Sequence, residues 1–159
     1  MRKVVSNTTP ILSLLKIDKL DLLRELYSEV IIPIAVYDEI EAGKEGLYYT
    51  DLAGIDWIKI QPLKYPSALP YLIDLDRGEA EVLILAREIG ADLVILDETL
   101  GRRYASLLDL KLTGTIGILL KAKELGLISS VKELLRELQG KGVWLSRSLV
   151  DYVTGLAGE

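Results

Sequence analysis

The sequence predicts an α/β fold with a parallel sheet of about five strands and helices on both faces. Short apolar runs rich in β-branched residues alternate with longer stretches of helical period. These helical stretches are too long for hairpin turns, which favours parallel strands joined by crossover helices. No repeat, linker or low-complexity tract interrupts the 159 residues, a length typical of one domain. We therefore expect residues 1–159 to form a single domain.

The first half of the chain supplies three predicted strands, all short and apolar: Val4–Val5, Val30–Ile32 and residues 57–60. Helices are predicted near residues 10–16, 19–27 and 33–43. Pro33 suits the first turn of the third helix because that turn does not use its missing backbone N–H, and Gly43 is a typical helix end.

The second half begins with an irregular or short helical segment, residues 61–74, which contains three prolines. A helix that Gly90 closes, "DRGEAEVLILAREIG", and a buried strand, "DLVILD", come next. The remaining predicted elements are a short strand at Leu110–Leu112 and helices near residues 98–108, 115–125, 130–139 and 147–156.

The composition limits the chemistry, because the chain contains no cysteine and no histidine. This excludes Cys/His zinc sites, thiol nucleophiles, Ser-His-Asp triads and imidazole bases. Any catalysis would therefore depend on carboxylates, lysines, hydroxyls or a hard, oxygen-bound metal ion.

Charge and hydropathy bear on location and partners. No apolar run approaches the roughly 20 residues that span a bilayer, and no signal-peptide pattern opens the chain. We therefore expect a cytoplasmic protein without membrane contact. The net charge of −5 argues against a generally basic surface, although it allows a local basic strip for nucleic acid. One Asn and two Gln beside abundant Lys and Glu are typical of a hyperthermophile.

Two polar residues stand where predicted strands end. Asn7 follows Val4–Val5, and Asp97 follows "LVIL". Open parallel sheets bind ligands outside the carboxyl ends of their strands, so both residues are candidates for a site. Taken singly, each is more simply interpreted as a helix cap or turn residue.

Two glutamates lie on helices that begin near the same edge. On a helical wheel Glu79 falls in the apolar arc, whereas Glu81 points with Glu88 toward a solvated face. We therefore expect Glu79 to be buried and Glu81 to be exposed. Burying a carboxylate is costly unless something binds it, although the helix dipole also favours Glu79 in a first turn. Glu39 falls at the border of its helix's apolar stripe, where a solvated position is slightly favoured.

These four residues could converge at one groove: Asn7, Glu39, Glu79 and Asp97. Like charges packed together are unfavourable unless a cation neutralises them. Without His or Cys, the matching cation is Mg²⁺ or Mn²⁺. Such an ion could polarise a phosphodiester and activate a water for hydrolysis.

Five segments spread along the chain carry a resemblance to a known family: "VVSNTTPILSLLKI", "VIIPIAVYDEI", "DRGEAEVLILARE", "LVILDETLGRRYA" and "LTGTIGILLKAKELGLI". The sequence resembles the PIN-domain family, metal-dependent ribonucleases that include the VapC-type toxins, and is most similar to a PIN-like branch with a "VSNTTP" opening. The resemblance implies a PIN-like fold. It also implies that the family's acidic quartet, which is catalytic and binds metal, falls on Asn7, Glu39, Glu79 and Asp97.

Asn7 departs from the family pattern, because most PIN nucleases carry an Asp at the end of the first strand. Its carbonyl oxygen can still ligate a hard cation but brings no charge. We therefore expect a weakened metal site and a doubtful catalytic rate, with the fold unaffected. The amide can also donate a hydrogen bond, to Asp97 or to a phosphate oxygen. Thr8 and Thr9 could position metal-bound water or phosphate, although capping the next helix is their simpler role.

Basic residues near Asp97 are candidates for contacts with RNA. Arg102 and Arg103 follow Asp97 by about one helical turn, and we predict that they contact nucleic acid together with Thr8. Three later lysines are more simply solvated: Lys111, Lys121 and Lys123.

The leading hypothesis is a Mg²⁺- or Mn²⁺-dependent endoribonuclease of PIN type that is the toxin of a toxin–antitoxin pair. Its partners would be an RNA substrate and a small antitoxin protein. One alternative is a catalytically weakened PIN-like module that binds RNA or protein without cutting; another is a nuclease that acts on DNA flaps or single strands. We also expect a homodimer, because the apolar content is high and the resembled family commonly pairs.

Overall fold

A five-stranded parallel sheet lies at the centre of the computed structural model, which describes residues 2–159. The strands stand in the order β3-β2-β1-β4-β5, and all of their pairings are parallel. Their bounds are β1 (Val4–Ser6), β2 (Val30–Pro33), β3 (Ile58–Gln61), β4 (Leu93–Ile95) and β5 (Leu112–Thr113). The predicted fold class, a parallel α/β sheet of five strands, is confirmed.

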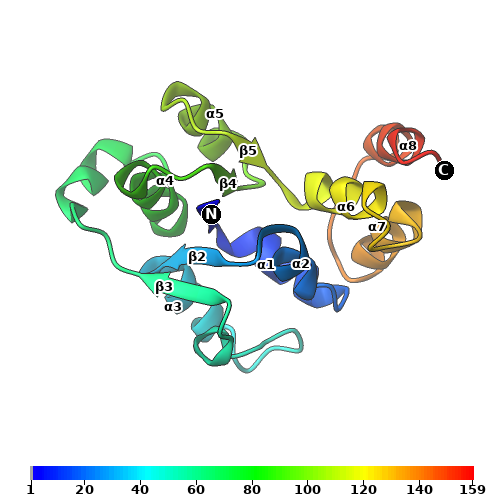
Figure 1. Cartoon of the computed structure of the whole chain (residues 1–159), viewed down its shortest axis with the longest axis horizontal. Coiled ribbons are helices and arrows are strands. Elements are labelled where there is room, and N and C mark those ends of the chain that lie inside the picture. The colour runs from blue at the N-terminus through cyan, green and yellow to red at the C-terminus, as the bar shows by residue number, and fades with distance from the viewer. Residues whose placement is uncertain (1) are drawn as a thin grey trace.

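Helices cover both faces of this sheet. They are α1 (Thr8–Lys16), α2 (Asp21–Tyr27), α3 (Ile34–Ala42), α4 (Arg77–Ile89), α5 (Thr99–Leu107), α6 (Thr115–Glu124), α7 (Val131–Gly140) and α8 (Arg147–Leu156). In Figure 1, α4 lies on one side of the sheet, and α1, α2 and α6 lie on the other. Helices α7 and α8 pack against α6 as an outer layer, and α3 contacts both α1 and α4.

The remaining regular segments are two 3-10 turns, η1 (Leu52–Gly54) and η2 (Pro66–Leu72). The second falls inside residues 61–74, where the prolines predict an irregular or short helical segment. Helix α1 begins at Thr8, two residues earlier than expected, because Pro10 is accommodated in its first turn. Within residues 2–159, none of the helices has the length and apolar character needed to cross a bilayer.

The centre of the sheet explains why its strands read as continuous apolar runs. Every residue of β1, β2 and β4 is buried, as expected for parallel strands with both faces covered. Beyond β1, the Asn7 N–H donates to the carbonyl of Ile95 at 2.9 Å. This bond continues the ladder by one residue and fixes Asn7 at the carboxyl edge of the sheet, beside the end of β4.

Helix α4 packs against β1, β2 and β4. Its buried apolar residues include Val82, Leu83 and Leu85. The Asp76 side chain caps its start by accepting from the Glu79 N–H at 2.8 Å. Gly90 ends the helix in the left-handed conformation with φ of 62°. The start of α4 therefore lies at the carboxyl edge, opposite the end of β1.

The prediction that Glu81 is exposed is wrong. Its exposed fraction is 4 %. One carboxylate oxygen accepts from the Ala35 N–H at 3.2 Å, and the other accepts from Arg77 Nε at 2.9 Å. The helical wheel accounts only for the sheet-facing side of α4, but α3 covers a second side of the same helix. Glu81 is buried between these two helices and is fully paired there.

Candidate active site

Three oxygen atoms from different parts of the chain surround one glycine at the carboxyl edge. A Cβ on Gly78 would lie 2.5 Å from Glu39 Oε1, 3.4 Å from Asn7 Oδ1 and 3.5 Å from Asp76 Oδ1. The first oxygen comes from α3, the second from the end of β1 and the third from the cap of α4. Gly78 thus leaves room for these side chains to approach one another.

Asn7 is held in a fixed orientation by a carboxylate. Its exposed fraction is 3 %, and its Nδ2 donates to Glu98 Oε2 at 3.1 Å. Thr9 Oγ1 donates to the other oxygen of Glu98 at 2.6 Å. Because Nδ2 is directed at Glu98, the orientation of Oδ1 is also set.

The other atom of this amide has no partner. Asn7 Oδ1 is buried and accepts no hydrogen bond from the described residues. The residue stands at the N-cap position of α1, yet its side chain makes no capping hydrogen bond. Buried acceptors without a donor are rare in folded proteins and require an explanation. The simple interpretation of Asn7 as a cap does not supply one.

Glu79 is buried among other carboxylates. Its exposed fraction is 7 %, and a Cβ on Gly101 of α5 would lie 2.9 Å from its Oε2. Burial raises the pKa of Glu79 to about 8, with further contributions from its contact with Asp76 and from the charges of Glu98 and Glu39. Without a cation nearby, this carboxyl group therefore keeps its proton to a higher pH than an ordinary glutamate does.

Glu39 is exposed along its length, but its carboxylate reaches inward to Gly78. Burial of that carboxyl group raises its pKa, the neighbouring Thr8 hydroxyl partly offsets the rise, and the charges of Asp76 and Glu98 add to it. Thr8 itself is buried, and its Oγ1 has no hydrogen bond of good geometry within residues 2–159.

Asp97 is engaged on the other side of this region. Its Oδ1 accepts from the Thr115 N–H at 2.8 Å, and its Oδ2 accepts from the Thr115 hydroxyl at 2.7 Å. Asp97 thus holds the start of α6. The charges that raise the pKa of Glu39 and Glu79 include Glu98 but not Asp97. The structure therefore brings Asn7 and Glu39 together at Gly78, leaves Glu79 within reach of the Glu39 charge, and pairs the Asp97 carboxylate with Thr115 instead.

Two acidic residues that the sequence did not predict lie beside these side chains. They are Asp76, which accepts from the Glu79 N–H, and Glu98, which accepts from Asn7. Asp76 stands at an ordinary helix-cap position. Its place directly before the helix that carries Glu79 is the sequence feature that could have indicated a role at the site. Glu98 is the neighbour of Asp97 in an extended segment, where successive side chains point to opposite sides. This alternation is a signal that only one of Asp97 and Glu98 can face the cluster.

The residues of the cluster fit a divalent cation. Within residues 2–159, no three acidic side chains are already arranged to hold one metal ion together. Asn7 Oδ1, however, supplies a neutral oxygen beside Glu39 Oε1 and Asp76 Oδ1. A hard cation would satisfy the unpaired amide oxygen and lower the raised carboxyl pKa values. We call Asn7, Glu39, Asp76, Glu79 and Glu98 the acidic cluster.

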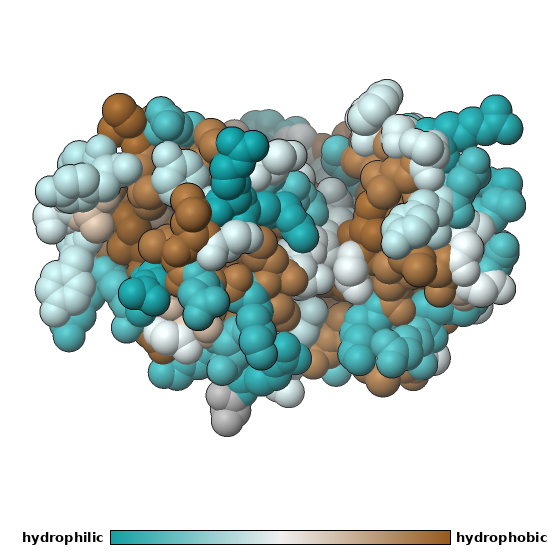
Figure 2. Space-filling model, turned by 90° about the horizontal axis from the view of Figure 1, so that it is seen from above, coloured by the Kyte–Doolittle hydropathy of each residue, from teal (hydrophilic) through white to brown (hydrophobic). Residues whose placement is uncertain are grey.

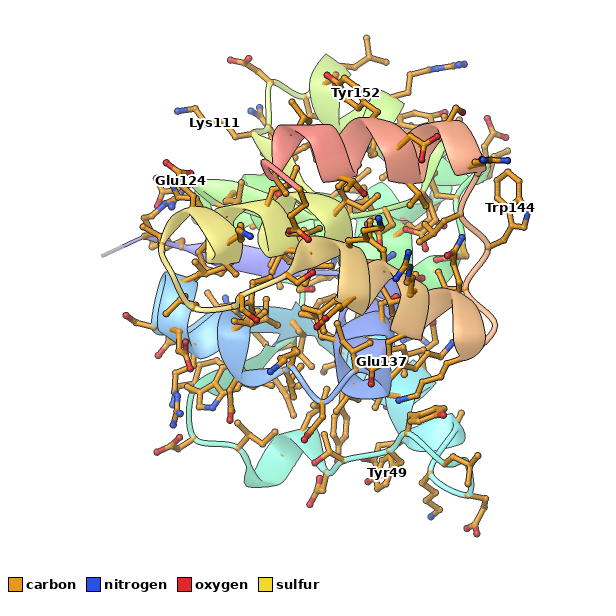
Figure 3. The ribbon with its side chains drawn as sticks, turned by 90° about the vertical axis from the view of Figure 1, so that its right-hand side faces the viewer. Tyr49, Lys111, Glu124, Glu137, Trp144 and Tyr152 are labelled. Carbon is orange, nitrogen blue, oxygen red and sulfur yellow. The ribbon has the colours of Figure 1, made fainter. Side chains whose placement is uncertain are left out.

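The predicted nucleic-acid contacts occupy different surroundings. Arg102 is half-buried, and its Nη1 donates to the Leu96 carbonyl at 2.9 Å. Arg103 is exposed. Lys111 lines a separate hollow with Arg2 and Asp92, on the opposite side of the molecule from Trp144 in Figure 3. Arg102 therefore lies at the carboxyl edge, beside the residue that follows β4.

A parallel sheet with an acidic cluster at its carboxyl edge defines the chain as an α/β protein with a nuclease-type fold. The model of a family described as a PIN domain matches residues 3–159, and the chain belongs to that family. PIN domains are generally nucleases and typically depend on a divalent metal ion. None of the curated proteins matches the chain.

Proposed function

We propose that this PIN domain is an endoribonuclease that depends on Mg²⁺ or Mn²⁺. The observation that carries the proposal is the buried, unpaired Oδ1 of Asn7, which faces the same point as Glu39 Oε1 and Asp76 Oδ1. A buried amide oxygen that lacks a donor and lies beside two carboxylate oxygens is expected where a hard cation binds. The loss of one charge at position 7 is offset by Asp76 and Glu98, which bring carboxylates that the resembled quartet lacks.

The side chains divide the work of holding the ion. Asn7, Glu39 and Asp76 would bind it directly, and Glu98 would orient Asn7 through the bond to Nδ2. Glu79 would join them once its proton has left. Asp97 would reach the ion only by giving up Thr115. The bound cation would supply the polarisation of a phosphodiester and a more acidic water.

We propose further that the chain is the toxin of a toxin–antitoxin pair, that its partner is a small antitoxin protein, and that it forms a homodimer. These proposals rest on its membership of the PIN family and its resemblance to the VapC-type toxins. They also fit the exposed side chains of Tyr71, in η2, and Ile73, directly after it.

The direct test is Mn²⁺ titration by calorimetry together with cleavage of an RNA pool in Mg²⁺, Mn²⁺ or EDTA. Wild type should bind Mn²⁺ and cut RNA only with metal. Glu39→Gln should bind at least about 10-fold more weakly, because it removes one of the charged ligand oxygens. Asp38→Asn is the matched control, since Asp38 is the exposed neighbour of Glu39 on α3. Equal Mn²⁺ binding by wild type and Glu39→Gln would overturn the metal site.

A second candidate is a PIN-like module that binds RNA or protein without cutting. The neutral Asn7 and the engagement of Asp97 with Thr115 favour it. The same assays distinguish the nuclease from the binding module. A binding module would bind RNA in EDTA and would leave the RNA uncut in Mg²⁺ and in Mn²⁺. Single-stranded DNA in parallel reactions distinguishes a nuclease for DNA from one for RNA.

A further inference from the structure

Two large aromatic side chains project from the C-terminal part of the chain. Trp144, in the segment between α7 and α8, has an exposed fraction of 84 %, and Tyr152, on α8, has one of 67 %. Figure 3 shows Trp144 just beyond the start of α8, and Tyr152 standing out from α8. Side chains of this size are mostly buried unless they contact a partner.

Both aromatic residues line hollows that meet at Asp97. Trp144 borders a hollow of about 290 Å³ that also contains Thr9 and Asp97. Tyr152 borders a larger hollow of about 630 Å³ that also contains Asp97 and Arg102. Figure 2 shows a depression between the half of the molecule with α4 and α5 and the half with α6 to α8.

This path continues into the acidic cluster. Thr9, in the wall of the smaller hollow, donates to Glu98 at 2.6 Å, and Glu98 in turn accepts from Asn7. An extended ligand that lies past Trp144 would therefore be separated from the acidic cluster by the Thr9 side chain alone. An extended ligand that lies past Tyr152 would meet Asp97 and Arg102 at the same edge of the sheet.

The charges and shapes of the two hollows select their occupant. Arg102, in the wall of the larger hollow, forms no ion pair with a carboxylate of residues 2–159. A guanidinium group free of ion pairs beside an exposed aromatic face suits a phosphate and a base together. Bases inside a duplex are already stacked, so only a single strand can place them on isolated aromatic rings.

We infer that Trp144 and Tyr152 bind single-stranded nucleic acid by stacking on its bases and that they position the strand at the acidic cluster. The inference rests on the proposed function. It assigns a binding role to α8 and to the segment before it, while Asp97 and Arg102 lie between the two stacking positions.

The test is binding of a labelled 12-residue oligouridylate, which has no stable secondary structure, measured by anisotropy in EDTA and in Mn²⁺. Trp144→Ala and Tyr152→Ala should each weaken binding by about 10-fold, the range expected for loss of one base stack. Trp144→Tyr should retain most of the affinity. Tyr71→Ala is the matched control, because Tyr71 is equally exposed, at 84 %, but borders a different hollow on η2.

A second readout is intrinsic fluorescence, since the chain contains two tryptophans and the other, Trp57, is buried. Stacking should quench the emission of wild type on adding oligouridylate, and Trp144→Phe should abolish the quenching. In cleavage assays with Mn²⁺, Trp144→Ala should raise KM about 10-fold with kcat nearly unchanged, because strand binding is lost while the metal site is intact.

The outcomes separate the inference from the proposed function. Unchanged affinity and KM in Trp144→Ala and Tyr152→Ala, with metal-dependent cleavage by wild type, would overturn the stacking role alone. Binding and quenching without cleavage in any metal would support the stacking role and overturn the nuclease. No binding by wild type in either buffer would overturn the inference. A shift from dimer to monomer in Trp144→Ala, with unchanged oligouridylate binding, would instead assign the aromatic residues to a protein interface.

Discussion

Two carboxylates of this chain, Glu79 and Glu159, lie in opposite environments. Burial, together with the neighbouring acids, raises the pKa of Glu79 to about 8. Glu159 accepts from the Ser130 hydroxyl at 2.6 Å and from the backbone N–H groups of Val131 and Lys132. These contacts at the start of α7, with the nearby Lys123, lower its pKa to about 2.

The difference distinguishes a carboxylate that stabilises the fold from one that we propose to bind a metal ion. Every partner of Glu159 is a donor, so the ionised group stabilises the fold and joins the chain end to α6 and α7. The charged form of Glu79 destabilises the metal-free fold, because no Lys or Arg side chain within residues 2–159 forms an ion pair with it. Glu81, two residues along α4, resembles Glu159: it is buried but fully paired. Unfavourable acids are typical of a site that a ligand completes.

The largest expected effect is that of Glu79→Gln on catalysis. Cleavage of RNA in Mn²⁺ should fall by about 100-fold or more, because one charge beside the metal is lost. The same change should stabilise the metal-free protein. Glu159→Gln should do the reverse, lowering the midpoint of unfolding while leaving cleavage unchanged. Paired measurements of cleavage rate and thermal unfolding check this, and equal effects of the two substitutions on cleavage would remove the distinction between the carboxylates.

The pH dependence of stability should also differ in sign between the two groups. The raised pKa of Glu79 means that its contribution is fully present below about pH 4.5 and is lost as pH rises to about 8. By pH 8, Glu79→Gln should therefore have a clearly higher free energy of unfolding than wild type in EDTA. At acid pH the two proteins should match.

For Glu159 the contribution is present above about pH 4.5 and is lost as pH falls toward about 2. The difference in the free energy of unfolding between wild type and Glu159→Gln should therefore shrink as the pH falls. Urea denaturation at several pH values measures both trends. A deficit that persists at pH 2 would assign the effect of Glu159→Gln to packing instead of charge.

Gly78→Ala should affect the acidic cluster more than the fold. The new methyl group would lie 2.5 Å from Glu39 Oε1, so this flexible carboxylate must move. Mn²⁺ affinity should fall by about 10-fold, whereas stability should change little, because alanine is the better helix former. Gly155→Ala in α8 is the control, since open space surrounds that position. Unchanged Mn²⁺ affinity in Gly78→Ala would place the metal elsewhere.

The fold could be predicted from the sequence because its signals are local and repeated. The apolar runs of β1, β2 and β4 and the Gly90 end of α4 required only periodicity and backbone preferences. The burial of Glu79 followed in the same way, because its position lies on the stripe of α4 that faces the sheet.

The site could be predicted only in part, because side-chain directions depend on elements distant in sequence. The paired burial of Glu81 requires knowing that α3 covers α4. The engagement of Asp97 requires the position of Thr115, which is 18 residues away. The approach of Glu39 to Gly78 and Asp76 depends on the path of the chain after β2, which the sequence does not give.

The smallest expected effect concerns Asn7→Asp, which would restore the carboxylate that most members of the resembled family carry. In the metal-free protein this change replaces the hydrogen bond from Asn7 Nδ2 to Glu98 with a contact between two carboxylates. The free energy of unfolding should therefore fall by about 1 kcal/mol in EDTA.

With metal bound, the same substitution should have the opposite sign. A further carboxylate adds attraction for the cation, and the cation keeps it ionised, so Mn²⁺ affinity should rise by about fivefold. Glu98→Gln is the natural companion, because a glutamine at 98 can donate to the new carboxylate and remove the repulsion in EDTA. Combining the two substitutions should restore stability and return Mn²⁺ affinity toward that of wild type. Calorimetric titration and urea denaturation of the four proteins measure this coupling. If Asn7→Asp changes neither quantity, Asn7 is not a ligand and its buried oxygen needs another explanation.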